Sequence, residues 1–284
     1  MKRKHVISGL LLVCFMAATV TMISSCKKKT DDPEVVTVKG CMDATALNFN
    51  ALANEDDGSC VVPEVKQRAI FFDFTATWCT YCGQWGIPNF EEVISTKPNE
   101  VVPLGCHDND EMSNTISEAI ATWYNLTGIP TLIVGNQAKS SSVSTLLSYV
   151  SQTNSAAPIA NAVGTMTVSG STITLKTQTK FFTASSGEYY LASYFVENGL
   201  MYSQTSATPD PYNHKHVLRG VAAGDEHGVN IASGSIASGT VVNKDYTVTA
   251  DPSWKMANVY VALVIWKKSG STWTFVNAWQ SKAN

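Results

Sequence analysis

Hydrophobic positions divide the chain into a first region where strand-like and helix-like segments alternate and a second region of strand-like segments only. Residues 69–75 form an apolar run with a single acid in it, as expected of a buried strand. Apolar residues then recur at helical spacing between residues 85 and 94. Further strand-like and helix-like segments follow at 101–106, 112–123, 128–134 and 143–150. This alternation predicts an α/β domain over residues 65–153 with a strand–helix–strand unit.

The pattern changes near residue 158, after a linker rich in Ser, Thr, Asn and Ala. Short alternating runs bounded by Gly and Ser predict an all-β sandwich domain of about seven strands over residues 158–284. The predicted strands are 165–168, 172–178, 189–196, 214–221, 246–250, 259–266 and 273–279.

Composition narrows the class of protein. With 44% hydrophobic and 15% charged residues, the 284-residue chain has the composition of a folded protein rather than a disordered one. Its net charge of −3 provides no basic surface for nucleic acid, so no nucleic-acid partner is expected. A long apolar run occurs only at the N-terminus, which excludes a multi-span membrane protein.

The N-terminus has the features of an export signal. Basic residues at positions 2–4 precede an interrupted apolar run, which ends at Ile23-Ser24-Ser25-Cys26. This ending resembles the lipobox of bacterial lipoproteins. The resemblance implies a signal peptide at 1–25, acylation of Cys26 (for example with palmitate) and a tether over 26–39. An uncleaved membrane anchor is the alternative interpretation.

The charged residues of the tether indicate where in the cell the protein is located. Its charged residues 27–32 are similar to the segment that follows the lipidated cysteine in surface lipoproteins of Bacteroidota. We therefore expect attachment to the outer membrane through the N-terminal lipid, on the periplasmic face or at the cell surface.

A small acidic loop over residues 40–61 follows the tether and contains Cys41 and Cys60. It resembles a short extracellular repeat, and in an oxidising compartment these two cysteines are the natural pair for a structural disulfide. The loop is either a simple solvated loop or a weak Ca²⁺ site. The oxygen ligands available for Ca²⁺ are Asp43, Asn48, Asn50, Asp56 and Asp57.

The strongest chemical signal is the segment Trp78-Cys79-Thr80-Tyr81-Cys82, which directly follows the first predicted strand. The buried acid Asp73 lies six positions before Cys79, and Gly-Ile-Pro-Thr stands at 128–131. Together these features resemble the thioredoxin superfamily. A zinc site is not expected, because the chain has no second Cys-x-x-Cys and no paired His-x-x-His. No metal and no organic cofactor are therefore predicted.

A cysteine at the start of a helix is favoured as a thiolate, so Cys79 is the expected nucleophile. Cys82, one turn later, is placed to resolve the mixed disulfide. The resemblance implies that Asp73 accepts the Cys82 proton, that Pro130 is cis and shapes a substrate groove, and that Trp78 is one of the catalytic-site residues. The chain departs from the family in its Thr-Tyr dipeptide between the cysteines and in Pro103, which stands where thioredoxins often have a lysine.

One further cysteine and three histidines each have two possible roles. Cys106 has no expected partner and is interpreted as a buried hydrophobe or, alternatively, as a third redox thiol. Strand alternation would place His214 and His216 on one face, where His227 could complete a metal site, although a polar strand face is the favoured interpretation.

The stretch Asn213–Arg219, Asn-His-Lys-His-Val-Leu-Arg, resembles the C-terminal motif of the twenty-eight-kilodalton outer-membrane-protein (Omp)-related lipoprotein family of Bacteroidota. That family combines a lipoprotein signal, a thioredoxin-like domain and a C-terminal β domain, and the resemblance covers about residues 65–284. Two functions remain open. One is an envelope thiol–disulfide oxidoreductase acting on protein thiols or disulfides with a redox partner. The other is a surface binding or adhesion lipoprotein that keeps the thioredoxin-like fold as a scaffold.

Overall fold

A computed structural model describes residues 36–281 of the chain. The predicted signal peptide, the lipidation site Cys26 and most of the tether lie outside these residues. Within the described part, no helix combines the length and the apolar character needed to cross a membrane.

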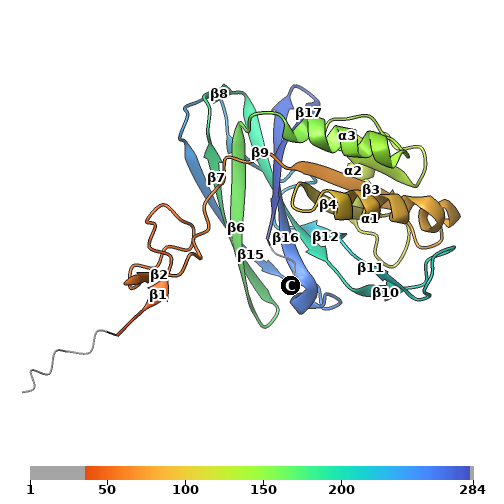
Figure 1. Ribbon diagram of the computed structural model, residues 1–284, viewed down its shortest axis with the longest axis horizontal. Helices are drawn as coiled ribbons and strands as arrows, with labels where there is room; N and C mark the ends of the chain where they lie inside the picture. The colour runs from red at the N-terminus through yellow and green to blue at the C-terminus, as the bar shows by residue number, and fades with distance from the viewer. Residues whose placement is uncertain (1–35, 282–284) are drawn as a thin grey trace, which may run out of the picture. The chain divides into compact units, whose positions relative to one another are not determined.

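The first region of the fold is an α/β domain (Figure 1). Strands β3 and β4 are parallel and are joined through a helix, as the hydrophobic pattern predicts, while β5 pairs with β3 in the antiparallel direction. Alternate residues of β3 point to opposite faces of the sheet: Phe71 packs with α1 and α3, and Phe72 packs with α2. The elements are β3 (Ala69–Thr75), the π-helical segment η1 (Cys82–Gly86), α1 (Ile87–Thr96), β4 (Val101–His107), α2 (Thr115–Trp123), β5 (Thr131–Val134) and α3 (Val143–Asn154).

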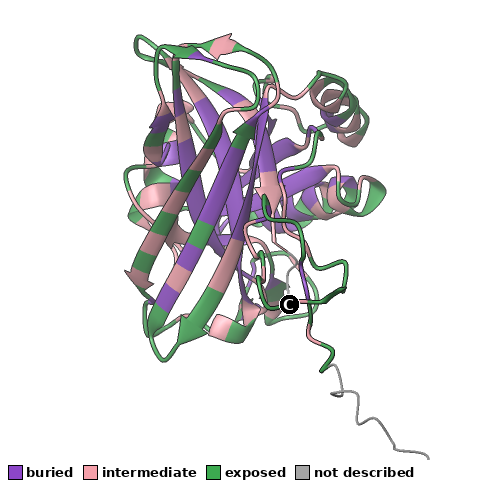
Figure 2. Cartoon of the chain, turned by 90° about the vertical axis from the view of Figure 1, so that its left-hand side faces the viewer, coloured by how far each residue is buried: buried purple, intermediate pink, exposed green. Residues whose placement is uncertain are grey.

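The second region is a sandwich of two β layers, as predicted. A three-stranded antiparallel sheet of β15, β7 and β6 packs its apolar face on β9 and β16 of the larger sheet. Figure 2 shows the alternating exposure along the three-stranded sheet and the mostly buried strands behind it. The main strands are β6 (Ala160–Ser169), β7 (Thr172–Phe181), β9 (Glu188–Glu197), β12 (Val217–Val221), β13 (Val229–Ala232), β15 (Val241–Thr249), β16 (Val259–Ser269) and β17 (Thr272–Gln280).

The two regions share one continuous sheet. Strand β12 pairs antiparallel with β9 on one side and parallel with β4 on the other, where Val217 stands opposite Gly105. The strand order is β17-β16-β9-β12-β4-β3-β5, with β13 added to β9. Residues of the β region are therefore held next to β4, the parallel neighbour of the strand β3 that leads into the cysteine motif.

The predicted strand 214–221 is wrong. The chain forms β11 (Tyr212–His214), which pairs with β10 (Leu200–Tyr202), and then turns at His216 before β12 begins. His216 has a φ of 58°, a left-handed conformation that breaks strand alternation. The remaining short elements are β1 (Lys39–Gly40), β2 (Glu55–Asp56), β8 (Ser185–Ser186), β14 (Ser235–Ile236) and η2 (Met256–Asn258).

The predicted Cys41–Cys60 disulfide is present in the acidic loop. Each of the three aspartates of the loop accepts a backbone N–H two residues further on, and Asn48 hydrogen-bonds the backbone of Ser59 and Val61. Among the residues that the structure describes, these acids do not gather into a cluster of ligands. Their observed contacts stabilise turns of the loop.

Candidate active site

The cysteine pair lies at the junction of β3 and the helix that follows it. Cys79 donates its N–H to the carbonyl of Ala76 at 3.2 Å, which closes a tight turn, and the chain is helical from Thr80 onward. The two cysteines form a disulfide. Cys79 is 6% exposed and Cys82 is fully buried, so Cys79 is the more accessible of the pair.

The start of the helix directs a backbone N–H at the sulfur of Cys79. The N–H of Cys82 donates to Sγ of Cys79 at 3.1 Å. A backbone donor at this position and the helix dipole both favour negative charge on Cys79 when the pair is reduced. This geometry suits a nucleophilic thiolate.

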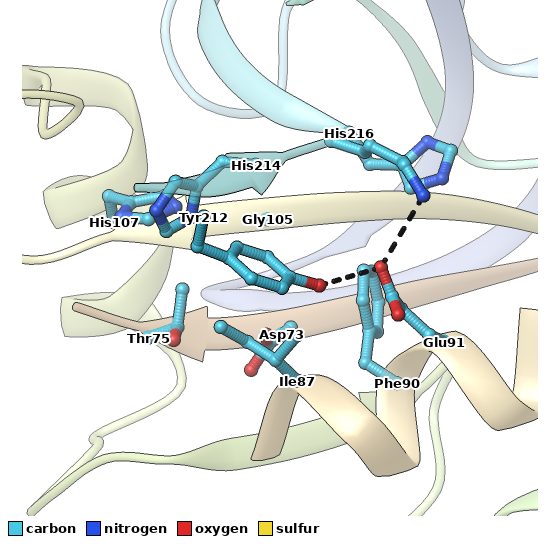
Figure 3. Close-up of a pocket in the computed structure, with 11 residues that line it drawn as sticks. Asp73, Thr75, Ile87, Phe90, Glu91, Gly105, His107, Tyr212, His214 and His216 are labelled. Carbon is cyan, nitrogen blue, oxygen red and sulfur yellow. Dashed lines mark hydrogen bonds and ion pairs between the residues drawn. The ribbon is translucent and has the colours of Figure 1, made fainter. Parts of the chain in front are cut away.

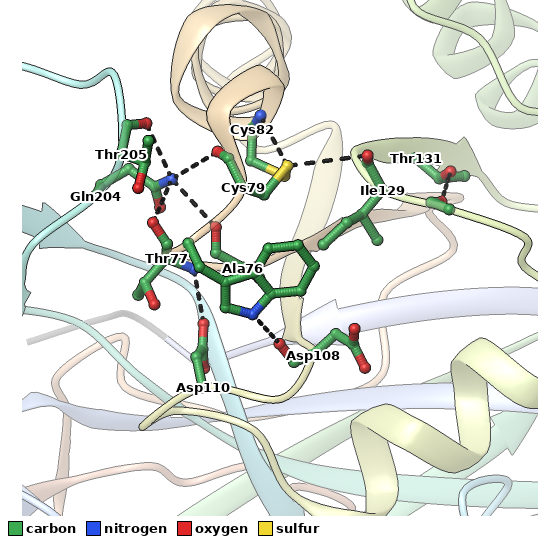
Figure 4. Close-up of a disulfide and its surroundings, with 12 residues drawn as sticks. Ala76, Thr77, Cys79, Cys82, Asp108, Asp110, Ile129, Thr131, Gln204 and Thr205 are labelled. Carbon is green, nitrogen blue, oxygen red and sulfur yellow. Dashed lines mark hydrogen bonds between the residues drawn. A yellow bond between two sulfur atoms is a disulfide. The ribbon is translucent and has the colours of Figure 1, made fainter.

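Trp78 and the cis-proline loop adjoin the cysteine pair, and Figure 4 shows Ile129 of that loop beside Cys79. Trp78 is 53% exposed, and its indole N–H donates to the carbonyls of Asp108 and Asn109, both at 3.2 Å. The Ile129–Pro130 bond is cis, as the resemblance implies, and the carbonyl oxygen of Ile129 lies 3.8 Å from Sγ of Cys79. The cis-proline loop therefore lies against the Cys79 sulfur.

A cleft of about 390 Å³ lies between Trp78, α2 and Ile129 of the cis-proline loop. Its wall contains apolar side chains and the acids Asp108 and Glu118. Cys106 also lines it but is buried, and burial raises the pKa of this thiol well above its ordinary value. Cys106 is free and has the environment of a buried hydrophobe, which was the first of its two predicted interpretations.

Asp73 lies on β3 with its side chain buried, opposite Gly105 of β4. Burial raises the pKa of this carboxyl from 3.8 to about 7. Pro103 pairs with Phe71, two residues away, so no lysine stands beside the acid in the sheet. An acid with this pKa can exchange a proton near neutral pH.

Sequence reasoning missed the residue that holds the other side of the motif. Gln204 follows β10, and its side-chain nitrogen donates to the carbonyls of Ala76, Thr77 and Cys79 at 3.1, 3.2 and 3.3 Å. The N–H of Thr205 also donates to the carbonyl of Thr77 at 2.8 Å. A polar loop with no motif carries these contacts, so no sequence signal could have identified them.

A second group supports the turn from β4. Oδ2 of Asp110 accepts the N–H of Thr77 at 2.9 Å and lies 2.7 Å from Nδ1 of His107. Burial opposes ionisation of Asp110, but the hydrogen bond and charge of His107 and the N–H groups of Thr77 and Met112 hold its pKa below the ordinary value. The Asp110 carboxylate thereby anchors the turn before Cys79.

The three histidines considered for a metal site lie in different surroundings. The rings of His214 and His107 meet edge to face with centres 5.3 Å apart, and Nδ1 of His216 lies 2.8 Å from the Tyr260 hydroxyl. His227 stacks on Trp273 with ring centres 3.9 Å apart. The structure does not bring the three together.

Comparison with known proteins gives two family matches. The family described as outer membrane protein Omp28 matches residues 117–283, and the thioredoxin family matches residues 58–154. No curated protein matches the chain. Together with the structure, the matches confirm the predicted thioredoxin-like domain followed by a β domain.

Two solved structures are similar to this one. The structure of HBP35 of Porphyromonas gingivalis has a TM-score of 0.66 at 16% identity, covering 78% of this chain and 77% of that one. A domain of the outer membrane lipoprotein Omp28 from Porphyromonas gingivalis has a TM-score of 0.30 at 15% identity, covering 45% of this chain and 89% of that one. The first likeness shows the fold alone.

Proposed function

This chain belongs to the outer membrane protein Omp28 family, and from that premise we propose that it is a lipid-anchored thiol–disulfide oxidoreductase of the bacterial envelope. The observation that carries the proposal is the hydrogen bond from the Cys82 N–H to Sγ of Cys79, a sulfur that lies 3.8 Å from the Ile129 carbonyl of the cis-proline loop and directly follows the exposed Trp78. This combination favours a reactive Cys79 thiolate next to a surface that a polypeptide can contact.

In the proposed reaction, the Cys79 thiolate attacks a substrate disulfide. The substrate S–S bond breaks, a mixed disulfide forms, and the released substrate thiolate takes up a proton. Cys82 gives its proton to Asp73 and attacks the Cys79 sulfur, which re-forms the Cys79–Cys82 disulfide and releases the second substrate thiol. The substrate gains two electrons, so a reduced redox partner must reduce the pair again; the reverse sequence oxidises a dithiol substrate.

Turnover of insulin disulfides tests the activity. We expect wild type to reduce insulin with dithiothreitol as electron donor, and Cys79→Ser to lose the protein-dependent rate. Cys106→Ala is the matched control, because it removes a free cysteine that is buried away from the disulfide, and it should retain the wild-type rate. Equal rates for wild type and Cys79→Ser would exclude catalysis by Cys79.

Anchoring is the second part of the proposal and has its own test. Acylation at Cys26 predicts that palmitate is incorporated into wild type and not into Cys26→Ser. Protease treatment of intact cells then distinguishes the two faces of the outer membrane: cleavage places the chain at the cell surface, and full protection places it in the periplasm.

A second candidate function, a surface-binding scaffold, is favoured by the closed surroundings of the motif. Cys79 is only 6% exposed, and Gln204 holds the turn before it. In that case the disulfide would be a structural bridge and would resist reduction.

A further inference from the structure

A small polar cavity of about 20 Å³ lies at the junction of β3, β4, α1 and the segment 212–216 (Figure 3). Its buried polar lining includes Asp73 and Thr75, each 2% exposed, and His214, 3% exposed. Asp73 Oδ1, Thr75 Oγ1 and His214 Nε2 have no hydrogen-bond partner among residues 36–281. Buried polar atoms that remain unpaired are costly, and three of them around one cavity indicate a common ligand.

The donors and acceptors around the cavity fit a water molecule. A cavity of this volume has room for about one water, which needs two to four polar partners. Burial and then the charge of His107 lower the pKa of His214 to about 4, so the ring is neutral near neutral pH. In a neutral imidazole one nitrogen donates and the other accepts, so the unpartnered Nε2 can take either role toward a water. The Thr75 hydroxyl can either donate or accept.

The cavity also has a connection to the surface. Tyr212 donates its hydroxyl to Oε1 of Glu91 at 2.8 Å, and Nζ of Lys215 lies 3.6 Å from the same carboxylate. Glu91 and Lys215 are partly exposed and line the cavity together with Tyr212. The titratable groups lining it are Asp73 from β3, His107 from β4, Glu91 from α1, Tyr212 and His214 from β11, and Lys215 and His216 from the turn that follows.

We propose that a water molecule bound by Asp73, Thr75 and His214 is the route by which Asp73 exchanges its proton with solvent, past the Tyr212–Glu91 pair. This rests on the proposed function, in which Asp73 accepts the Cys82 proton. That proton passes through the water to solvent, while the Cys82 electron pair forms the bond to Cys79 and the bond from Cys79 to the substrate sulfur breaks. No further co-reactant is consumed. Thr75 and His214 are thus positioning residues, and the β region supplies one of them.

Thr75→Val tests the proposal because it removes one hydroxyl with little change in volume. Thr179→Val is the matched control: Thr179 is also a buried threonine with an unpartnered hydroxyl, but it lies on β7 and does not line the cavity. Thr75→Ser retains the hydroxyl and serves as the conservative rescue. Should Thr75→Val fail to fold, Tyr212→Phe interrupts the route at its mouth.

The first readout does not need activity. In the full oxidised chain, the Asp73 carboxyl is titrated by ¹³C NMR and assigned by its loss in Asp73→Asn. Loss of the water-mediated hydrogen bond disfavours the carboxylate, so Thr75→Val should raise the Asp73 pKa, whereas Thr179→Val and Thr75→Ser should leave it at the wild-type value. An unchanged pKa in Thr75→Val overturns the proposal.

The second readout is the rate at which Cys82 resolves a preformed mixed disulfide, measured by stopped flow as a function of pH. We expect Thr75→Val to slow this step about three- to tenfold and to shift its pH profile upward, as for the loss of one neutral hydrogen bond. If wild type shows no Cys79-dependent turnover, the proposed function is wrong. The NMR titration then still tests whether the water is bound at Asp73. Normal turnover with identical pH profiles in Thr75→Val and Thr179→Val defeats the proton route alone.

Discussion

The side-chain nitrogen of Gln204 lies 3.3 Å from the carbonyl oxygen of Cys79, although 125 residues separate them in the chain. The same nitrogen contacts the carbonyls of Ala76 and Thr77, so one side chain of the β region holds most of the turn that leads to Cys79. The shape of this turn therefore depends on both regions of the fold.

Replacing Gln204 with alanine should loosen this turn. Three carbonyls would lose the Gln204 donor while each keeps a backbone N–H, so the expected cost is that of a typical hydrogen bond, about 0.5–1.5 kcal/mol of unfolding free energy. We also expect a shift in the Cys79–Cys82 reduction potential, measured against glutathione buffers. Gln178→Ala is the control, because the Gln178 amide is also buried and donates to Thr45, far from the motif. Equal shifts in potential for both variants would contradict a specific role for Gln204.

Gly83 provides a steric test of the same contact. A Cβ atom at Gly83 would lie 2.1 Å from the carbonyl oxygen of Thr205, so the 203–211 loop or the helix must move. Overpacking of this kind costs about 1–3 kcal/mol, and Gly83→Ala should lower the melting temperature and increase proteolysis of that loop. Gly128→Ala is the control, because no atom lies within 4 Å of its added Cβ. Unchanged protease resistance in Gly83→Ala would show that the loop does not pack on the motif.

Asp73 should make stability depend on pH. Because its pKa rises from 3.8 unfolded to about 7 folded, the folded state holds this proton more tightly, and stability is lost as pH rises through that window. Relative to Asp73→Asn, the oxidised wild type should lose on the order of 4 kcal/mol between about pH 4 and pH 7.

Urea unfolding of both chains across this pH range measures the difference. Asp43→Asn is the control, since hydrogen bonds from Thr45 lower the pKa of that exposed acid and no loss is expected above about pH 4. A constant difference between wild type and Asp73→Asn from acid to neutral pH would mean that Asp73 is not protonated in the folded state.

The acidic loop should be stabilised locally by its disulfide. The Cys41–Cys60 bond spans a sequence separation of 19, and closing a loop of this size contributes ~3 kcal/mol in the chain-entropy model. In the double variant Cys41→Ser/Cys60→Ser, residues 40–61 should lose hydrogen-exchange protection while the main unfolding transition stays at the wild-type midpoint. A large drop in that midpoint would show that the loop stabilises the whole fold.

The features that the sequence could predict are those that repeat locally along the chain. Alternation of residues 69–75 with the helical pattern after residue 85 predicts a strand–helix–strand unit, and the position of Cys79 at a helix start follows from it. The cis bond before Pro130 came from family resemblance, because few X–Pro bonds are cis.

The remaining features depend on contacts between distant segments. No local sequence pattern predicts three of these contacts: the pairing of β12 with β4, the placement of His214 beside His107, and the hydrogen bonds of Gln204. Strand alternation predicts that His214 and His216 lie on one face. That prediction is wrong because His216 adopts a left-handed conformation, which ends the strand.

The reduction potential of the Cys79–Cys82 pair tests the central claim most directly. The full chain is equilibrated in glutathione or dithiothreitol buffers of known potential, and the fraction of reduced pair is counted by thiol alkylation and mass spectrometry, with Cys106→Ala used to remove the free thiol. A catalytic pair predicts a potential between about −120 and −270 mV. A value well below about −300 mV would contradict the account and identify the pair as a structural bridge.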